Sequence, residues 1–201
     1  MKLNLHTYFI MGSANCEAPL RVLEEALLAG VTCFQLREKT LTGPALETFA
    51  KQCLALCHTY DVPFIVNDDV ALALKIGADG VHVGQDDMAA AQARALLPTK
   101  IIGVSAHTSE EIAQAVADGA DYVGIGPIFA TTSKADAQTP CGIAALKAMH
   151  EAFPTLPKVA IGGITAARAP AVRATGVDGV AVISAIASAS DVTKAVKSFN
   201  L

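Results

Sequence analysis

The sequence contains no tryptophan, and aromatic residues make up only 5% of its 201 residues. The hydrophobic fraction is nevertheless 52%, so the core must be built mainly from Ala, Val, Leu and Ile. Such residues suit parallel strands that are buried on both faces, whose sequences read as continuous apolar runs. The length fits one domain and no linker or low-complexity stretch divides the chain, so we treat residues 1–201 as a single domain.

The sequence also lacks a block rich in lysine and arginine, and its formal net charge is −4. This balance argues against nucleic acid as a partner, and small-molecule ligands are expected instead. The first residues contain no sustained apolar stretch, so we expect neither a secretory signal nor a membrane span, but a soluble cytoplasmic protein. An anionic ligand would then be bound by a few placed cations or by a metal ion.

The five cysteines form no CxxC motif, and their odd number means that they cannot all pair. Cys53 and Cys57 lie four residues apart on an expected helix and so share one face. A metal clip is one interpretation of this pair. The interpretation that we favour is two small apolar residues in a reducing cytosol.

One sequence pattern recurs four times along the chain: a glycine at the expected end of a helix, a small or acidic residue, and a short apolar run. The glycines are Gly30, Gly77, Gly119 and Gly176. Glycine provides the left-handed cap that ends many helices, and the run after it reads as a buried strand. Each interval between copies is long enough for two strand–helix units.

Four more strands are expected between the copies, at 7–11, 63–66, 101–104 and 159–161, and helical periodicity is clear at 20–28, 45–56, 89–97 and 110–117. Strict alternation of strands and helices indicates parallel strands joined by right-handed crossovers. Eight such units close into a (β/α)8 barrel, the TIM barrel. A doubly wound open sheet is the alternative, although no GxGxxG motif follows the first strand.

Functional groups of such a barrel lie at the C-terminal ends of its strands. Asp68 and Asp87 follow neighbouring strands, and two carboxylates at one rim repel each other unless a cation lies between them. Mg²⁺ commonly binds one or two carboxylates and completes its shell with water and substrate phosphate oxygens. Arg37, Lys39 and Lys134 are expected at the same mouth, where they suit a diphosphate.

A second phosphate site is expected after the last two strands, from Gly162, Gly163 and Ser184. The alternative is that the two glycines only form a tight turn. Near the metal site, Asp69 and Asp86 are expected to be helix caps or first-turn acids rather than ligands.

Two histidines lie near this rim. His82 falls within an expected strand, where a hydrogen-bonded core residue is more common than a catalytic one. His107 follows the fifth strand, and its role stays open.

Taken in order, these motifs resemble those of the thiamine phosphate synthase family. They are 35–39 (QLREK), 67–69 (NDD), 80–87 (GVHVGQDD), 105–108 (SAHT), 126–134 (GPIFATTSK), 160–164 (AIGGI) and 182–184 (VIS). No single motif is decisive, but the ordered set is specific and covers nearly the whole chain. One position departs from the family pattern: Ser133 stands where threonine is usual, which keeps the hydroxyl.

The resemblance implies a transferase that joins 4-amino-2-methyl-5-pyrimidinylmethyl diphosphate to a thiazole phosphate, plain or carboxylated. Pyrophosphate is released, with CO₂ if the thiazole is carboxylated. One Mg²⁺ per subunit is implied, held by Asp68 and Asp87. The residues implied for the pyrimidine diphosphate are Gln35, Leu36, Arg37, Glu38, Lys39, Asn67, Ser105 and Lys134, of which Lys134, Ser105, Arg37 and Lys39 are given catalytic roles. Those implied for the thiazole phosphate are Thr131, Thr132, Ser133, Gly163, Ile183 and Ser184.

Two other functions remain open at this point. A thiazole tautomerase of the same superfamily would transfer a proton and would need neither diphosphate nor metal; that branch is understood to use a His near the place where Ser105 stands here. A non-enzymatic regulatory or binding protein on the same barrel is the second alternative, and the metal and diphosphate residues argue against it. The oligomeric state is undetermined, with a homodimer among the options.

Overall fold

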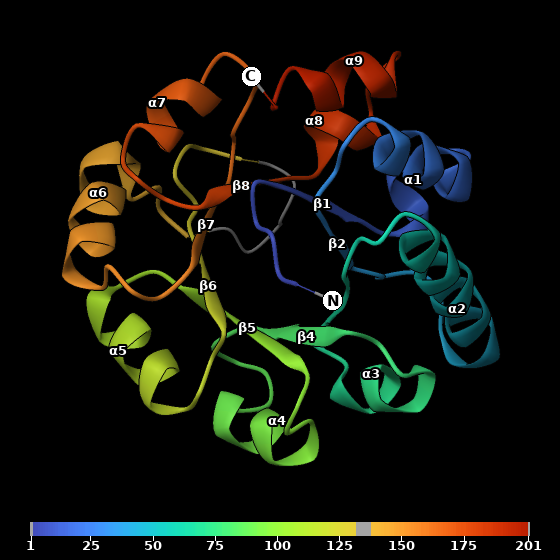
Figure 1. Cartoon of the computed structure of the whole chain (residues 1–201), viewed down its shortest axis with the longest axis horizontal. Helices are drawn as coiled ribbons and strands as arrows, with labels where there is room; N and C mark the ends of the chain where they lie inside the picture. The colour runs from blue at the N-terminus through green and yellow to red at the C-terminus, as the bar shows by residue number, and fades with distance from the viewer. Residues whose placement is uncertain (1, 132–137, 201) are drawn as a thin grey trace.

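The computed structural model describes residues 2–131 and 138–200, in which parallel strands alternate with helices (Figure 1). The strands are β1 (Thr7–Met11), β2 (Cys33–Leu36), β3 (Phe64–Asn67), β4 (Gly80–Val83), β5 (Ile101–Ala106), β6 (Tyr122–Ile125), β7 (Lys158–Ile161) and β8 (Gly179–Val182). The helices are α1 (Pro19–Leu28), α2 (Gly43–Thr59), α3 (Val70–Ile76), α4 (Ala90–Leu96), α5 (Ser109–Ala117), α6 (Gly142–Ala152), α7 (Ala169–Arg173), α8 (Ser184–Ala187) and α9 (Val192–Lys197). A short 3₁₀ helix, η1 (Ser13–Asn15), follows β1.

The sheet is a closed barrel. Each strand pairs in parallel with the next, and β8 pairs with β1 through Thr7 opposite Val180 and Phe9 opposite Val182. Figure 1 looks down the barrel, with the strands in an inner ring and the helices outside it. The predicted (β/α)8 barrel is therefore confirmed, and the open doubly wound sheet is excluded by the β1–β8 pairing.

The local signals for helix ends are confirmed in most places. The four glycines of the repeat have positive φ angles, between 72° and 105°, as left-handed helix ends require. The Asp69 carboxylate caps α3 by accepting a hydrogen bond of 2.8 Å from the Leu72 N–H. The same prediction for Asp86 was wrong, because α4 begins later and has Ala89 at its N-cap.

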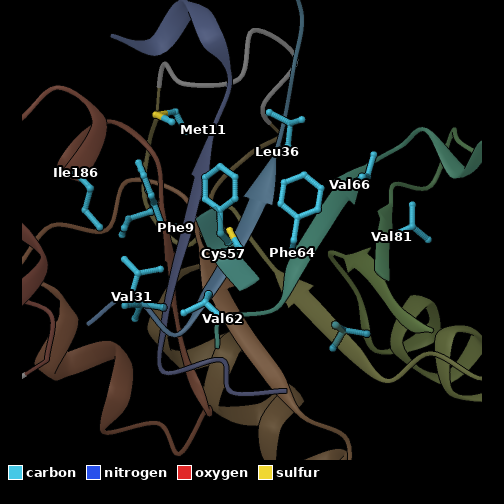
Figure 2. Packing of buried hydrophobic residues seen from close by; sticks show 14 of the residues in the cluster. Phe9, Met11, Val31, Leu36, Cys57, Val62, Phe64, Val66, Val81 and Ile186 are labelled. Carbon is cyan, nitrogen blue, oxygen red and sulfur yellow. The ribbon is translucent and has the colours of Figure 1, made fainter. Parts of the chain in front are cut away.

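Side chains that alternate along each strand fill two separate cores. Phe9 and Met11 of β1 point outward and pack with the helices, in a layer that Figure 2 shows together with Phe64 and Leu36. The residues between them, Tyr8 and Ile10, point into the barrel. Burial of one such large side chain stabilises the fold by roughly 1.5–3 kcal/mol, so the outer layer carries much of the stability.

The cysteines are free thiols, and Cys53 and Cys57 are fully buried in the outer core. Burial raises the pKa of Cys53 to about 12, so its thiol stays protonated and behaves as a small apolar group. In the part of the chain that the structure describes, no helix is both long and apolar enough to cross a membrane.

Candidate active site

A cavity of about 460 Å³ opens at the C-terminal ends of the strands. Most of the residues predicted for the site line it: Gln35, Arg37, Lys39, Asn67, Asp68, Asp87, Ser105, Thr131, Gly163, Ile183 and Ser184. They come from loops and strand ends spread over most of the sequence. The barrel brings them together because parallel strands all end at the same rim.

Asp68 stands at the centre of the charged side of the cavity. Its φ of 64° lies in the left-handed region, which Asp tolerates better than most residues and which is often found at functional sites. Burial and the neighbouring Asp87 carboxylate raise the pKa of Asp68, while the Lys39 ammonium, 3.5 Å from its Oδ2 atom, lowers it. Asp87 is held in place by the Gly84 N–H, which donates to its Oδ2 over 2.7 Å.

A divalent cation would fit this pair of carboxylates. Burial and the Asp87 carboxylate raise the pKa of Asp68 more than the Lys39 ammonium lowers it, so a further cation would be favourable beside this pair of carboxylates. Among residues 2–131 and 138–200, no group of three or more His, Cys, Asp and Glu is arranged to hold a metal. Two carboxylates with substrate phosphate oxygens are a donor set typical of Mg²⁺, so the residues present suit that ion better than a metal that needs a full protein cage.

Glu38 is directed at the backbone. Its Oε2 atom accepts a hydrogen bond of 2.7 Å from the Ser13 N–H, and its Oε1 atom accepts from the N–H groups of Lys39, Thr40 and Leu41. Partial burial opposes ionisation, but these N–H groups outweigh it and lower the pKa of Glu38 to about 2. The carboxylate thus ties the loop that carries Arg37 and Lys39 to the loop after β1.

Four other predicted site residues need separate comment. Leu36 is 2% exposed and packs in the outer core, so its proposed contact with substrate would involve its backbone. Thr132, Ser133 and Lys134 lie outside the described residues, and their roles stay predictions.

Gly162 and Gly163 form a tight connection between β7 and the following loop. Their φ angles are 99° and 62°, and a Cβ atom on Gly162 would lie only 2.5 Å from the Pro127 Cβ. The loop is further held by Arg168, whose guanidinium donates to the Gly163 carbonyl over 2.6 Å and stacks 4.6 Å from the centre of the Phe129 ring. Close approach to the loop after β6 therefore requires glycine here, whichever ligand binds.

His107 also lines the cavity, and it supports the loop after β6. Its Nδ1 atom is hydrogen-bonded to the Gly126 carbonyl, and its backbone N–H donates to the Glu111 carboxylate over 2.5 Å. Because a carbonyl can only accept, Nδ1 carries a proton. This geometry gives His107 a supporting role at the rim.

Polar residues whose place the sequence did not reveal lie at the floor of the cavity and beneath it. Tyr8 and Tyr122 are 1% and 0% exposed, and their hydroxyl oxygens lie 2.7 Å apart. The hydrogen-bonded state predicted for His82 is confirmed, since its two ring nitrogens each lie 3.0 Å from a hydroxyl oxygen, of Tyr122 and of Ser105. His82 also lines the cavity, and the inward alternation of β1 and β4 was the signal that could have revealed Tyr8 and His82.

The family model described as thiamine monophosphate synthase matches residues 7–186. The thiamine-phosphate synthase of Lysinibacillus sphaericus is 56% identical over 98% of this chain and 94% of that protein. The thiamine-phosphate synthase of Geobacillus kaustophilus is 58% identical over 94% of this chain and 87% of that protein.

Solved structures agree with the sequence relatives. The thiamine phosphate pyrophosphorylase from Pyrococcus furiosus superposes with a TM-score of 0.89 at 36% identity, covering 96% of this chain and 93% of that one. A 3-hexulose-6-phosphate synthase superposes with a TM-score of 0.69 at 19% identity, covering 96% and 97% of the two chains, and this shows the shared barrel alone.

Proposed function

The chain belongs to the thiamine monophosphate synthase family and is a transferase of that class, and from this premise we propose how its cavity works. The substrates would be an aminopyrimidinylmethyl diphosphate and a thiazole phosphate, plain or carboxylated. The products would be thiamine phosphate and pyrophosphate, with CO₂ from a carboxylated substrate. The observation that carries the proposal is the meeting of Arg37 and Lys39 with the Asp68–Asp87 pair at one side of the cavity.

The diphosphate would bind at this charged side. Arg37 and Lys39 offer a planar fork and a point charge, which together suit the several oxygens of a diphosphate. Mg²⁺, held by Asp68 and Asp87, would neutralise negative charge on the diphosphate when bound. Lys134, given a catalytic role by the family resemblance, would add a further cation.

The thiazole phosphate would bind opposite, where Gly163, Ile183 and Ser184 line the cavity. Backbone N–H groups of such a loop suit a monophosphate, because they bind it without added positive charge. Thr131 also lines the cavity, and Thr132 and Ser133, the next residues in the sequence, are further predicted ligands.

The proposed reaction is dissociative. The bond between the methylene carbon and the diphosphate oxygen breaks, and its electron pair leaves with the diphosphate, whose charge Arg37 and Lys39 stabilise. The electron-rich aminopyrimidine stabilises the cationic methylene, and the thiazole nitrogen then donates its lone pair to that carbon. No protein nucleophile is needed, and much of the rate arises from holding both fragments in one cavity.

The test measures thiamine phosphate formed by purified protein from both substrates with Mg²⁺, in parallel with EDTA. Asp68→Asn should lower turnover by about two or more orders of magnitude, because it removes a charge at the metal and diphosphate site. Asp69→Asn is the matched control, since it changes the adjacent carboxylate but keeps an N-cap for α3.

Product that disappears with EDTA and with Asp68→Asn, but persists with Asp69→Asn, would support the proposal. Full activity in EDTA would show that the reaction does not need a metal ion, and would contradict that part of the proposal. Isomerisation of the carboxythiazole without metal, and no thiamine phosphate, would instead favour the tautomerase. We also propose a cytoplasmic location, because five free thiols suit a reducing compartment.

A further inference from the structure

A line of hydrogen bonds crosses the interior of the barrel beneath the cavity. It begins at Gln35 of β2, whose Nε2 atom donates to the Tyr8 hydroxyl over 2.8 Å, and it ends at Ser105 of β5. Between these two cavity-lining residues lie the side chains that we call the relay: Tyr8, Tyr122 and His82. These three side chains have no role in the reaction proposed above.

The barrel is built to leave room for the relay. A Cβ atom on Gly103 would lie 2.2 Å from the Tyr122 ring, and one on Gly124 would lie 3.2 Å from His82. Glycine at these two inward positions leaves the space that the Tyr122 and His82 rings occupy. Burial raises the pKa values of Tyr8 and Tyr122 well above the usual range, so both phenols keep their protons.

The direction of the hydrogen bonds can be followed from Gln35. Because its amide N–H donates to Tyr8, the Tyr8 hydroxyl is left to donate to Tyr122. If Tyr122 instead donated to Tyr8, the Tyr8 hydroxyl would have to donate to the Cys33 sulfur, which is a weak acceptor. Tyr122 therefore donates to the Nδ1 atom of His82.

The same reasoning gives the direction of the hydrogen bond at the Ser105 end of the relay. A neutral His82 that accepts at Nδ1 must carry its proton on Nε2, and this N–H donates to the Ser105 oxygen. The Ser105 hydroxyl proton is then available to a ligand. At the other end of the line, the Gln35 amide N–H donates to Tyr8, so the Gln35 amide oxygen is available as an acceptor.

We propose that the relay fixes Gln35 as an acceptor and Ser105 as a donor toward the cavity, and thereby selects a 4-aminopyrimidine. An amino group next to a ring nitrogen presents one donor and one acceptor, which match this pair. A 4-oxopyrimidine presents the opposite order, an acceptor next to a ring N–H, and its carbonyl oxygen would face the Gln35 amide oxygen with no proton between them. The inference rests on the proposed function and makes the relay residues positioning residues of the pyrimidine site.

The test uses two probes that cannot react: (4-amino-2-methylpyrimidin-5-yl)methanol and its 4-oxo counterpart. Calorimetry should show that the unaltered protein binds the amino compound more tightly by roughly 100-fold. Tyr122→Phe removes the central oxygen of the relay, and it should narrow this preference about tenfold while thermal unfolding shows a folded protein. Tyr60→Phe is the matched control, because it removes a phenol oxygen that bonds to Glu24 on the outside of the barrel.

An unchanged preference in folded Tyr122→Phe protein would overturn the inference, as would an equal change in Tyr60→Phe. If Tyr122→Phe does not fold, Tyr8→Phe interrupts the same line one bond earlier. A second measurement examines the relay in the unaltered protein: ¹⁵N spectra of labelled histidine report which ring nitrogen of His82 is protonated. The His82 signals are assigned by their loss in His82→Gln. A proton on Nε2 supports the inference, and a proton on Nδ1 refutes it.

These outcomes separate the inference from the proposed function. Tyr122→Phe should also lower kcat/KM for the pyrimidine diphosphate about tenfold while the KM for the thiazole phosphate changes less than about twofold. An unaltered protein that makes no thiamine phosphate refutes the function. An active protein whose amino preference does not depend on Tyr122 refutes the relay alone.

Discussion

Replacement of Glu38 by Gln is expected to weaken the fold in a way that depends on pH. The carboxylate accepts four backbone N–H groups, from Ser13, Lys39, Thr40 and Leu41. These lower the pKa of Glu38 from 4.5 to about 2 against the opposing effect of partial burial. An uncharged carboxamide offers one acceptor oxygen in place of two and no charge.

The size of the effect follows from linkage. At about 1.4 kcal/mol for each pKa unit, a change from 4.5 to about 2 sets an upper bound of roughly 3.5 kcal/mol. Part of the carboxylate is in contact with solvent, so we expect about 1–2 kcal/mol near pH 7. For a chain of this length this corresponds to a fall in Tm of roughly 3–6 °C.

The sign of the pH dependence is fixed because the pKa of Glu38 is lowered by folding. The stabilisation is complete above about pH 4.5 and is lost as the pH falls toward 2. Urea unfolding of the unaltered and Glu38→Gln proteins, measured at several pH values, should therefore give a stability difference that narrows over this range. A difference that stays constant from pH 7 to pH 3 would refute the reasoning.

Glu47→Gln provides the matched control for salt. Hydrogen bonds and charge from Lys51 and Lys75 lower the pKa of Glu47 to about 2 as well, but these partners are exposed lysines. Added salt should therefore reduce the effect of Glu47→Gln and leave that of Glu38→Gln nearly unchanged. Equal salt sensitivity would show that backbone N–H groups are not what holds Glu38.

Three further changes test other parts of the structure. Lys158→Met removes a fully buried ammonium that donates to two carbonyls after α6, and urea unfolding should show a loss of about 2 kcal/mol; no loss would mean that these bonds contribute nothing net. Gly162→Ala puts a Cβ at positive φ against Pro127, and it should lower both Tm and kcat/KM; normal values would contradict the close approach. His107→Phe removes the bond to the Gly126 carbonyl and should destabilise the protein by about 1 kcal/mol while raising KM, whereas unchanged kinetics would exclude a supporting role at the rim.

The barrel could be predicted because its signals are local. Each glycine of the repeat, such as Gly77, ends a helix by adopting a positive φ, and that preference belongs to glycine itself. Alternation of strands and helices then restricts the topology to parallel strands with crossovers of one hand. The position of the site followed from the same logic, because polar residues after successive strands must meet at one rim.

Individual roles at the rim depended on contacts that spacing does not encode. Asp69 and Asp86 each read as a helix cap, but only the first is one, because the exact start of a short helix depends on tertiary packing. Glu38 read as a ligand within its motif, yet its carboxylate is bound by backbone from two loops. The motif indicates that Glu38 matters, but it does not reveal which groups the side chain contacts.

The sequence by itself determined the fold, the rim and the chemical class of the enzyme, because periodicity, glycine conformation and ordered motifs are properties of neighbouring residues. Only the tertiary structure decided which side chains meet inside the barrel. Tyr8 and Tyr122 are 114 residues apart and become hydrogen-bonded because closure of the barrel turns both strands inward at the same level. The register of a closed sheet is a collective result of all eight strands, and no single segment of the chain contains it.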